Sequence, residues 1–185
     1  MKKQLQKIFF LLFFTGCMTA PQFSFESDLK SEKSYQVPFQ QITFASERKR
    51  FDSAHHIENK LSQSPEVIIQ NWIHDNLIEN EIPGGKLQIV LHQAEIIREN
   101  QPAEHWWQTD YIKDTLNYNI ELISRKNDTT AHRLTVAGKT YAQMGRRISL
   151  MEKEKQWAQL YRTMLNHLEK EILNKIPHVV VSDKN

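Results

Sequence analysis

The stretch Ser149-Leu150-Met151-Glu152, followed by KEKQWAQLYRTMLNHLEKEI (153–172), contributes most to the predicted fold. Ser149 and Glu152 match a capping box, in which the hydroxyl and the carboxylate each accept a hydrogen bond from a free backbone N–H. Apolar residues then recur at helical spacing and predict one buried face on a helix of about six turns. The residues of this face are Leu150, Trp157, Leu160, Tyr161, Met164, Leu168 and Ile172. Pro177 ends the helix, because proline cannot continue it.

Three strands are predicted before this helix, at residues 86–98, 116–122 and 133–141. Apolar and polar residues alternate in each, which is typical of a sheet that is covered on one face. In the first strand the apolar positions change register between Leu91 and Ala94, and this shift predicts a β-bulge. Short turns join the strands, so neighbours are expected to pair antiparallel.

A second helix is predicted to begin at Ser64-Pro65-Glu66, which supplies a capping hydroxyl, a proline at the first helical position and an early acid. Its apolar stripe is Ile69, Trp72, Ile73 and Leu77. Pro83-Gly84-Gly85 is expected to end it. Before the helix, residues 36–47 predict one strand with Pro38 near its start.

The predicted order is therefore strand, helix, three strands, helix. Two amphipathic helices need a sheet face to cover. We therefore expect an α+β fold with a four-stranded antiparallel sheet and both helices on one face. Residues 35–177 would form this single domain, 17–34 a polar tether and 178–185 a flexible tail.

The N-terminus has the three parts of a secretory signal peptide. Lys2, Lys3 and Lys7 give a positive head, residues 8–14 are all hydrophobic, and Gly16 precedes Cys17. The apolar run is too short to cross a hydrocarbon core of about 30 Å as a helix. An ordinary signal peptide with an incidental cysteine and an uncleaved anchor are the alternatives.

Gly16-Cys17 resembles the lipobox of bacterial lipoproteins, although Phe14 stands where lipoboxes usually carry leucine. This resemblance implies that residues 1–16 are removed and that Cys17, once acylated, is the membrane anchor. Residue Met18 after the cysteine, rather than aspartate, implies the outer membrane with the domain facing the periplasm.

The charge and cysteine content restrict the partners of the mature chain. Removing residues 1–16 leaves 169 of 185 residues, with 21 Lys and Arg against 22 Asp and Glu. A nearly neutral domain has no nucleic-acid footprint and no polybasic surface for lipids. Cys17 is the single cysteine, so no disulfide can form within the chain.

Candidate catalytic and metal-binding residues are scattered. The eight histidines show no H-x-x-x-H or H-E-x-x-H spacing, so no metal site or cofactor is predicted. Glu95, Glu99, Glu104 and Asp110 crowd one region and are interpreted as solvated charges. The chain has no G-x-S-x-G motif, and its one thiol is the expected lipid site. We therefore expect a protein that is not an enzyme.

The most unusual feature outside the signal is the segment 104–111, which contains Trp106, Trp107 and Tyr111. Adjacent tryptophans in a connection between strands cannot both face one core, and exposed aromatic residues are enriched at interfaces. These three residues are the candidate partner contact. The alternative is that one tryptophan covers the sheet edge and the other the helices.

The segments Leu61-Ser62-Gln63-Ser64-Pro65, leading to Trp72, and Ser149-Leu150-Met151-Glu152-Lys153-Glu154 resemble a family of uncharacterised proteobacterial lipoproteins, mostly alphaproteobacterial. The chain departs from that family in being rich in Lys, Asn and Ile. The element order is also similar to that of the lipopolysaccharide-assembly lipoproteins and the auxiliary lipoproteins of ABC transport systems. The resemblance implies an envelope lipoprotein that binds a partner protein or a lipid. The alternative is a small ligand- or lipid-binding module that uses the open sheet face.

Overall fold

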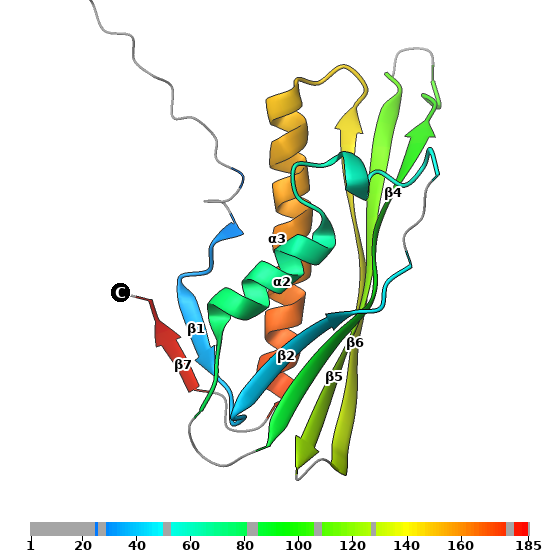
Figure 1. The fold of residues 1–185 in the computed structure, drawn as a ribbon. Helices are drawn as coiled ribbons and strands as arrows, with labels where there is room; N and C mark the ends of the chain where they lie inside the picture. The colour runs from blue at the N-terminus through cyan, green and yellow to red at the C-terminus, as the bar shows by residue number, and fades with distance from the viewer. Residues whose placement is uncertain are drawn as a thin grey trace, which may run out of the picture.

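Two sheets and two helices make an α+β fold (Figure 1). The computed structural model describes residues 25, 29–49, 53–80, 85–105, 109–126, 129–176 and 180–184. The strands are β1 (Lys33–Gln36), β2 (Gln41–Ser46), β3 (Leu77–Ile78), β4 (Lys86–Gln101), β5 (Tyr111–Lys126), β6 (Thr129–Gly145) and β7 (Val180–Asp183). The helices are α2 (Pro65–Asn76) and α3 (Leu150–Lys175), with a short 3-10 turn, η1, at Glu58–Lys60.

The larger sheet has the strand order β2-β4-β5-β6. Strands β4, β5 and β6 are antiparallel neighbours, as predicted, and each extends several residues beyond its predicted limits. The predicted bulge is confirmed by a register shift between Leu91 and Gln93. The expectation of an entirely antiparallel sheet is wrong, because β2 pairs parallel to β4. Helix α2 lies between these two strands in the chain, and such a crossover returns the chain in the same direction.

The smaller sheet has the order β3-β1-β7 and was not predicted. The single strand expected at 36–47 is divided between the two sheets, because the chain turns at Pro38, where Phe39 N–H donates to the carbonyl of Val37 at 2.8 Å. The tail expected to be flexible from residue 178 contains β7, which pairs antiparallel with β1. Its backbone groups therefore find partners that the sequence pattern does not reveal.

Both helices cover one face of the larger sheet. Helix α3 packs on β6 and α2 packs on β4. One core cluster contains inward-facing residues of β4 and β5 together with the apolar faces of both helices. Its fully buried members include Ile69, Leu87, Leu116, Ile120 and Leu168. This arrangement agrees with the expectation of two helices on a common face.

The helix starts agree with the sequence, but two residues of the apolar faces do not. Ser64 caps α2, and Ser149 with Glu152 forms the predicted capping box of α3. Leu77 lies in β3 rather than in α2, because the helix ends at Asn76, before the predicted stop at Pro83. Leu150 is exposed rather than buried, as the first residue of α3.

A buried carboxylate joins the sheet to α3. Asp114 of β5 is fully buried and accepts two hydrogen bonds from Arg98 of β4, at 2.7 and 2.6 Å. Trp157 of α3 donates its indole N–H to the same carboxylate at 2.7 Å. The guanidinium of Arg98 also lies 5.8 Å from the centre of the Trp157 ring. Three hydrogen bonds thus stabilise the negative charge of Asp114, and a buried carboxylate requires such partners.

Replacing Asp114 with asparagine should destabilise the fold by about 3 kcal/mol, because Arg98 loses the partner of its charge in a largely buried site. Urea unfolding followed by circular dichroism measures this loss. Asp110→Asn is the matched control, since Asp110 pairs with Arg146 on the surface at 3.3 Å. The control substitution should lower the free energy of unfolding by less than about 1 kcal/mol. Equal losses in the two variants would contradict a central role for Asp114.

A tyrosine on β5 lies across a glycine on β6. Tyr118 and Gly138 are direct cross-strand partners, and a Cβ atom at residue 138 would lie 2.2 Å from the Tyr118 hydroxyl oxygen. The Tyr118 hydroxyl lies 2.5 Å from Nδ1 of His167 in α3. Burial, and then the Glu171 carboxylate, raises the pKa of Tyr118, so the phenol keeps its proton and donates to His167. This hydrogen bond holds the ring over the glycine.

Gly138→Ala should lower the free energy of unfolding by about 1–3 kcal/mol, because the added methyl group displaces a buried ring that is fixed to α3. The control is Gly145→Ala on the same strand, where a Cβ atom would lie 3.4 Å from Ile148 Cγ2. This control should change stability by less than about 0.5 kcal/mol. The free energies of unfolding of the two variants in urea test the difference, and a tolerated Gly138→Ala would show that the ring moves freely.

Candidate ligand pocket

The structure describes one of the four residues that the sequence singles out. Cys17, Trp106 and Trp107 lie outside the described residues. Tyr111 is the first residue of β5, is partly buried, and pairs with Gln101 of β4 and Gly145 of β6. The structure therefore gives Tyr111 a place in the sheet, while contact with a partner stays a prediction.

The described part of the connection before Tyr111 is held to the end of β4 and to the turn between β6 and α3. The carboxylate of Asp110 accepts from the backbone N–H of Ala103 at 3.1 Å and from Arg146 at 3.3 Å. The carbonyl of Asp110 also accepts from the backbone N–H of Arg146. These bonds fix Ala103 and Asp110 on the two sides of the aromatic pair at this end of the sheet.

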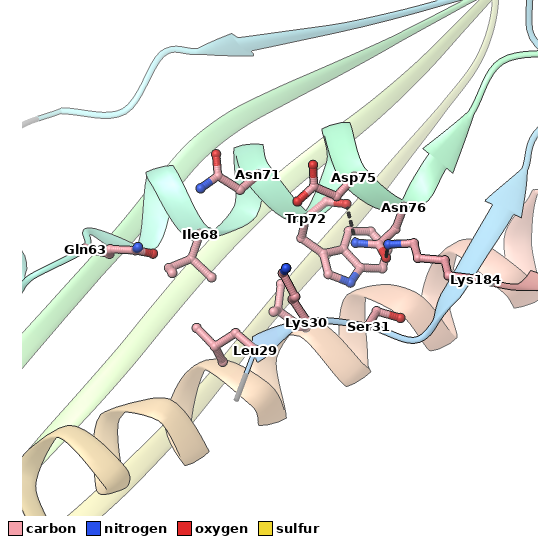
Figure 2. Close-up of a pocket in the computed structure, with 11 residues that line it drawn as sticks. Leu29, Lys30, Ser31, Gln63, Ile68, Asn71, Trp72, Asp75, Asn76 and Lys184 are labelled. Carbon is pink, nitrogen blue, oxygen red and sulfur yellow. Dashed lines mark hydrogen bonds between the residues drawn. The ribbon is translucent and has the colours of Figure 1, made fainter. Parts of the chain in front are cut away.

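A pocket of about 600 Å³ lies between α2, α3 and the segment that precedes β1 (Figure 2). Such a volume is typical of a small-molecule site. We call it the helix pocket. It is lined by Leu29, Lys30, Ser31, Gln63, Ile68, Asn71, Trp72, Asp75, Asn76, Leu165 and Lys184. These residues come from segments far apart in the chain, so the pocket exists only in the folded protein.

One end of the helix pocket is polar. Asn76 is 2% exposed and donates to the carbonyl of Trp72 at 2.7 Å, which orients its amide. Its carbonyl oxygen accepts from the ammonium of Lys184 at 2.9 Å. Lys30 and Ser31 lie opposite on the segment before β1 (Figure 2). Asp75 is the acidic residue of the lining, and His74 lies 3.1 Å from its carboxylate.

The other end and the floor of the helix pocket are apolar. Leu29 faces Ile68 across the pocket in Figure 2, and Leu165 of α3 also lines it. Trp72 lies between the two ends and is 5% exposed. Its ring packs against Tyr35 of β1, with the two ring centres 6.1 Å apart. The pocket therefore combines a firmly packed apolar floor with a polar rim that carries Lys30, Lys184 and Asp75.

The segment before β1 packs on α3 rather than extending away. Phe25 meets Tyr161 edge to face, with ring centres 5.7 Å apart, and Leu29 also packs against the core. The hydroxyl of Tyr161 donates to the carbonyl of Gln63 at 3.0 Å, and burial raises the pKa of this phenol. The expected tether at 17–34 is therefore packed on the fold at Phe25 and Leu29, because buried aromatic surface stabilises this position.

A smaller pocket of about 360 Å³ lies beside the β4 bulge, on the face opposite the helices. Its lining includes Glu47, His92, Glu95 and Asn119. Glu95 is 8% exposed and accepts from Gln93 at 2.6 Å, so the prediction that this acid is solvated is wrong. The alternating pattern placed Glu95 on the open face of the sheet, but neighbouring polar side chains cover it there.

Histidine and acidic side chains meet near this smaller pocket. His56 Nδ1 lies 3.7 Å from Glu58 Oε1 and 3.8 Å from Glu95 Oε2. His92 lies between Glu47, at 3.4 Å, and Glu121, at 3.2 Å. In the part of the chain that the structure describes, no set of three or more such side chains has the arrangement of a metal site.

Sequence reasoning missed the helix pocket. Lys30, Asn71 and Asn76 lie in segments interpreted as a tether and as a plain amphipathic helix, and Lys184 lies in the expected tail. One signal could have indicated it, namely that α2 carries Asn71, Asp75 and Asn76 close to its apolar stripe. The pairing of β7 with β1, which brings Lys184 to Asn76, has no signal in the periodicity.

Comparisons with solved structures find distant likenesses. The minor lipoprotein from Acinetobacter baumannii has a TM-score of 0.44 and 7% identity, over 76% of this chain and 96% of that one. The rare lipoprotein B from Shewanella oneidensis has a TM-score of 0.41 and 10% identity, over 72% and 94%. A DUF330 protein from Xanthomonas campestris has a TM-score of 0.42 and 11% identity, over 71% and 82%.

Two of these three neighbours are bacterial lipoproteins by name. No family model and no curated protein matches this chain in sequence. At such identities and TM-scores the likenesses assign neither a family nor a function. The resemblance to an alphaproteobacterial family and to lipopolysaccharide-assembly lipoproteins thus stays an expectation.

Membrane crossing by a helix has no support in the residues that the structure describes. Neither α2 nor α3 has an apolar stretch of the length that a bilayer requires.

Proposed function

We propose that this chain is a lipid-anchored protein of the bacterial envelope that binds a partner and catalyses no reaction. The observation that carries the proposal is the order of a positive head, a short apolar run and Gly16-Cys17 directly before a folded domain. Acylation of Cys17 would attach the domain to a membrane. The residue Met18 favours the outer membrane, with the domain facing the periplasm.

The packing of Phe25 on Tyr161 sets how far the domain can lie from such an anchor. Eight residue steps separate Cys17 from Phe25. A fully extended chain of this length spans at most about 29 Å. The proposed protein therefore works close to the bilayer surface, within about the thickness of a hydrocarbon core.

The proposed partner contact is the aromatic segment with Trp106, Trp107 and Tyr111. Asp110, which follows the two tryptophans in the chain, accepts hydrogen bonds from Ala103 and Arg146. Aromatic residues are enriched at protein interfaces, which supports this part of the proposal. Leu150 and Met151, in the first turn of α3, are 66% and 52% exposed and offer a further apolar surface.

A ligand-binding module is the second candidate function, and the helix pocket favours it. The open sheet face was the expected ligand site, but the pocket described there is the smaller one, and its lining is mainly polar, with Glu47 and Glu95 beside Lys49 and His92. The helix pocket is larger and has an apolar floor, which is the usual character of ligand sites.

Cys17→Ser should abolish incorporation of radiolabelled palmitate and release the chain from the membrane fraction. The thiol is the atom that would carry the lipid, and serine cannot form the thioether. Thr19→Ser is the control and should keep both label and membrane association. Mass spectrometry of the native chain that shows an intact Met1, or an unmodified thiol after processing, would contradict the anchor.

Replacing Trp106 and Trp107 with alanine should remove proteins that co-purify with the full chain after crosslinking in intact membranes. The expected loss is at least tenfold in recovered partner, because buried tryptophans commonly dominate interface energies. Tyr141→Ala is the control, since Tyr141 is a 60% exposed aromatic residue of β6 outside this segment. An unchanged set of partners in the double variant would remove this segment from the proposal.

A further inference from the structure

We infer that the free edge of β6 binds an extended, acidic segment of a partner protein, which joins the larger sheet as an added strand. We call this surface the β6 edge, meaning the side of Thr129–Gly145 that points away from β5. Partner segments bind sheet edges through main-chain hydrogen bonds, while alternate side chains supply the specificity. The inference goes beyond the proposed function, because it depends neither on Cys17 nor on the aromatic segment.

Strand β6 ends the larger sheet and leaves backbone groups without a strand partner (Figure 1). It is 17 residues long, and in the described part of the chain it pairs with β5 alone. In an antiparallel pair only every second residue bonds to the neighbouring strand, so the remaining N–H and C=O groups of β6 point to the free side. The strand contains no proline, which would remove a donor. An added strand therefore finds donors and acceptors along β6.

The opposite edge of the larger sheet is closed by the chain itself. Strand β2 is six residues long, and the N–H of its Ile42 donates to the carboxylate of Glu79 at 2.8 Å. Beyond β2, the segment before η1 covers β4, where the N–H of Ile57 donates to the carbonyl of Ile96 at 3.0 Å. Free edges promote unwanted pairing, so a long edge that the fold leaves open indicates a binding surface.

The β6 edge and the turn after it are basic. Residues 129–151 contain Arg133, Lys139, Arg146 and Arg147, and neither Asp nor Glu. Arg133 and Arg146 each have an acidic neighbour, at 3.1 and 3.3 Å. Lys139 and Arg147 are exposed and form no ion pair with another residue that the structure describes. The edge therefore carries positive charge that an acidic segment would match.

The spacing of two basic residues sets the pattern of the partner segment. Gly138 is covered by Tyr118 on the helix side of β6, so its neighbour Lys139 lies on the open face. Arg133 is six residues away and lies on the same face, since side chains alternate along a strand. Directly opposed side chains of neighbouring strands have Cβ atoms about 4.5–5.5 Å apart, which allows an ion pair. A matching segment therefore carries two acids six residues apart.

A second copy of this chain does not satisfy the same edge. Two β6 edges paired with each other would bring only basic side chains together, because neither strand contains an acid. Like charges on facing strands are destabilising. Charge therefore selects a partner of opposite sign over self-association.

Fluorescence anisotropy with labelled peptides tests the inference on the full processed chain in micelles of an uncharged detergent. The probe is a peptide of alternating threonine and valine in which two glutamates stand six positions apart. It should bind about tenfold more tightly than the same peptide with lysines in place of the glutamates. A third peptide keeps the glutamates but has methylated backbone nitrogens, and it should bind about tenfold more weakly than the probe, because it has lost its main-chain donors.

Lys139→Glu tests the charge of the β6 edge. It should weaken binding of the glutamate probe about tenfold and strengthen binding of the lysine peptide. Lys60→Glu is the matched control, because Lys60 is an exposed lysine of η1, which follows the segment on β4 rather than β6. This control should leave both affinities unchanged.

Hydrogen–deuterium exchange followed by mass spectrometry locates the bound probe. The amides of β6 should exchange more slowly when the probe is present, and those of β2 should exchange at the same rate with and without it. Any of four results would overturn the inference: no binding of the glutamate probe, equal binding of the methylated peptide, an unchanged affinity in Lys139→Glu, or protection at β2 in place of β6. A chain that sediments as a dimer with its β6 amides already protected would overturn it in favour of self-pairing.

Discussion

The buried carboxylate of Asp114 is the constraint on which the rest of the structure depends. It takes two hydrogen bonds from Arg98 on the neighbouring strand and one from Trp157 on α3. A carboxylate at 0% exposure is stable only when its charge and its lone pairs are matched. The position of α3 across the sheet is therefore set by directed bonds as well as by apolar packing. Tyr118, bonded to His167 above Gly138, fixes the same helix at a second point.

The fixed position of α3 also determines where ligands and partners could meet the domain. With α3 held on β6, a space remains between α2, α3 and the segment before β1, and this space is the helix pocket. Phe25 packs on Tyr161 of α3, so this point of the N-terminal segment is tied to the same helix. Helix α3 thus supports both the helix pocket and the packed position of Phe25.

Local patterns predicted the elements with short-range causes. The capping box at Ser149 and the Ser64-Pro65 start depend on neighbouring residues, and both are confirmed. The bulge after Leu91 was visible as a change in alternation. Such patterns did not predict which distant segments pair with each other. The parallel pairing of β2 with β4 and the strand β7 depend on backbone hydrogen bonds, which carry little side-chain signal.

The sequence by itself determined an α+β domain with two amphipathic helices and the starts of those helices, because each depends on residue types at short spacing. The Gly16-Cys17 signal stays a prediction from the same kind of short-range pattern. The tertiary structure alone decided the second sheet, the burial of Glu95 and the helix pocket. Lys30, Asn76 and Lys184 come from three separate segments and meet only when β7 pairs with β1. Sites of this kind are formed by long-range packing, and long-range packing is not encoded in periodicity.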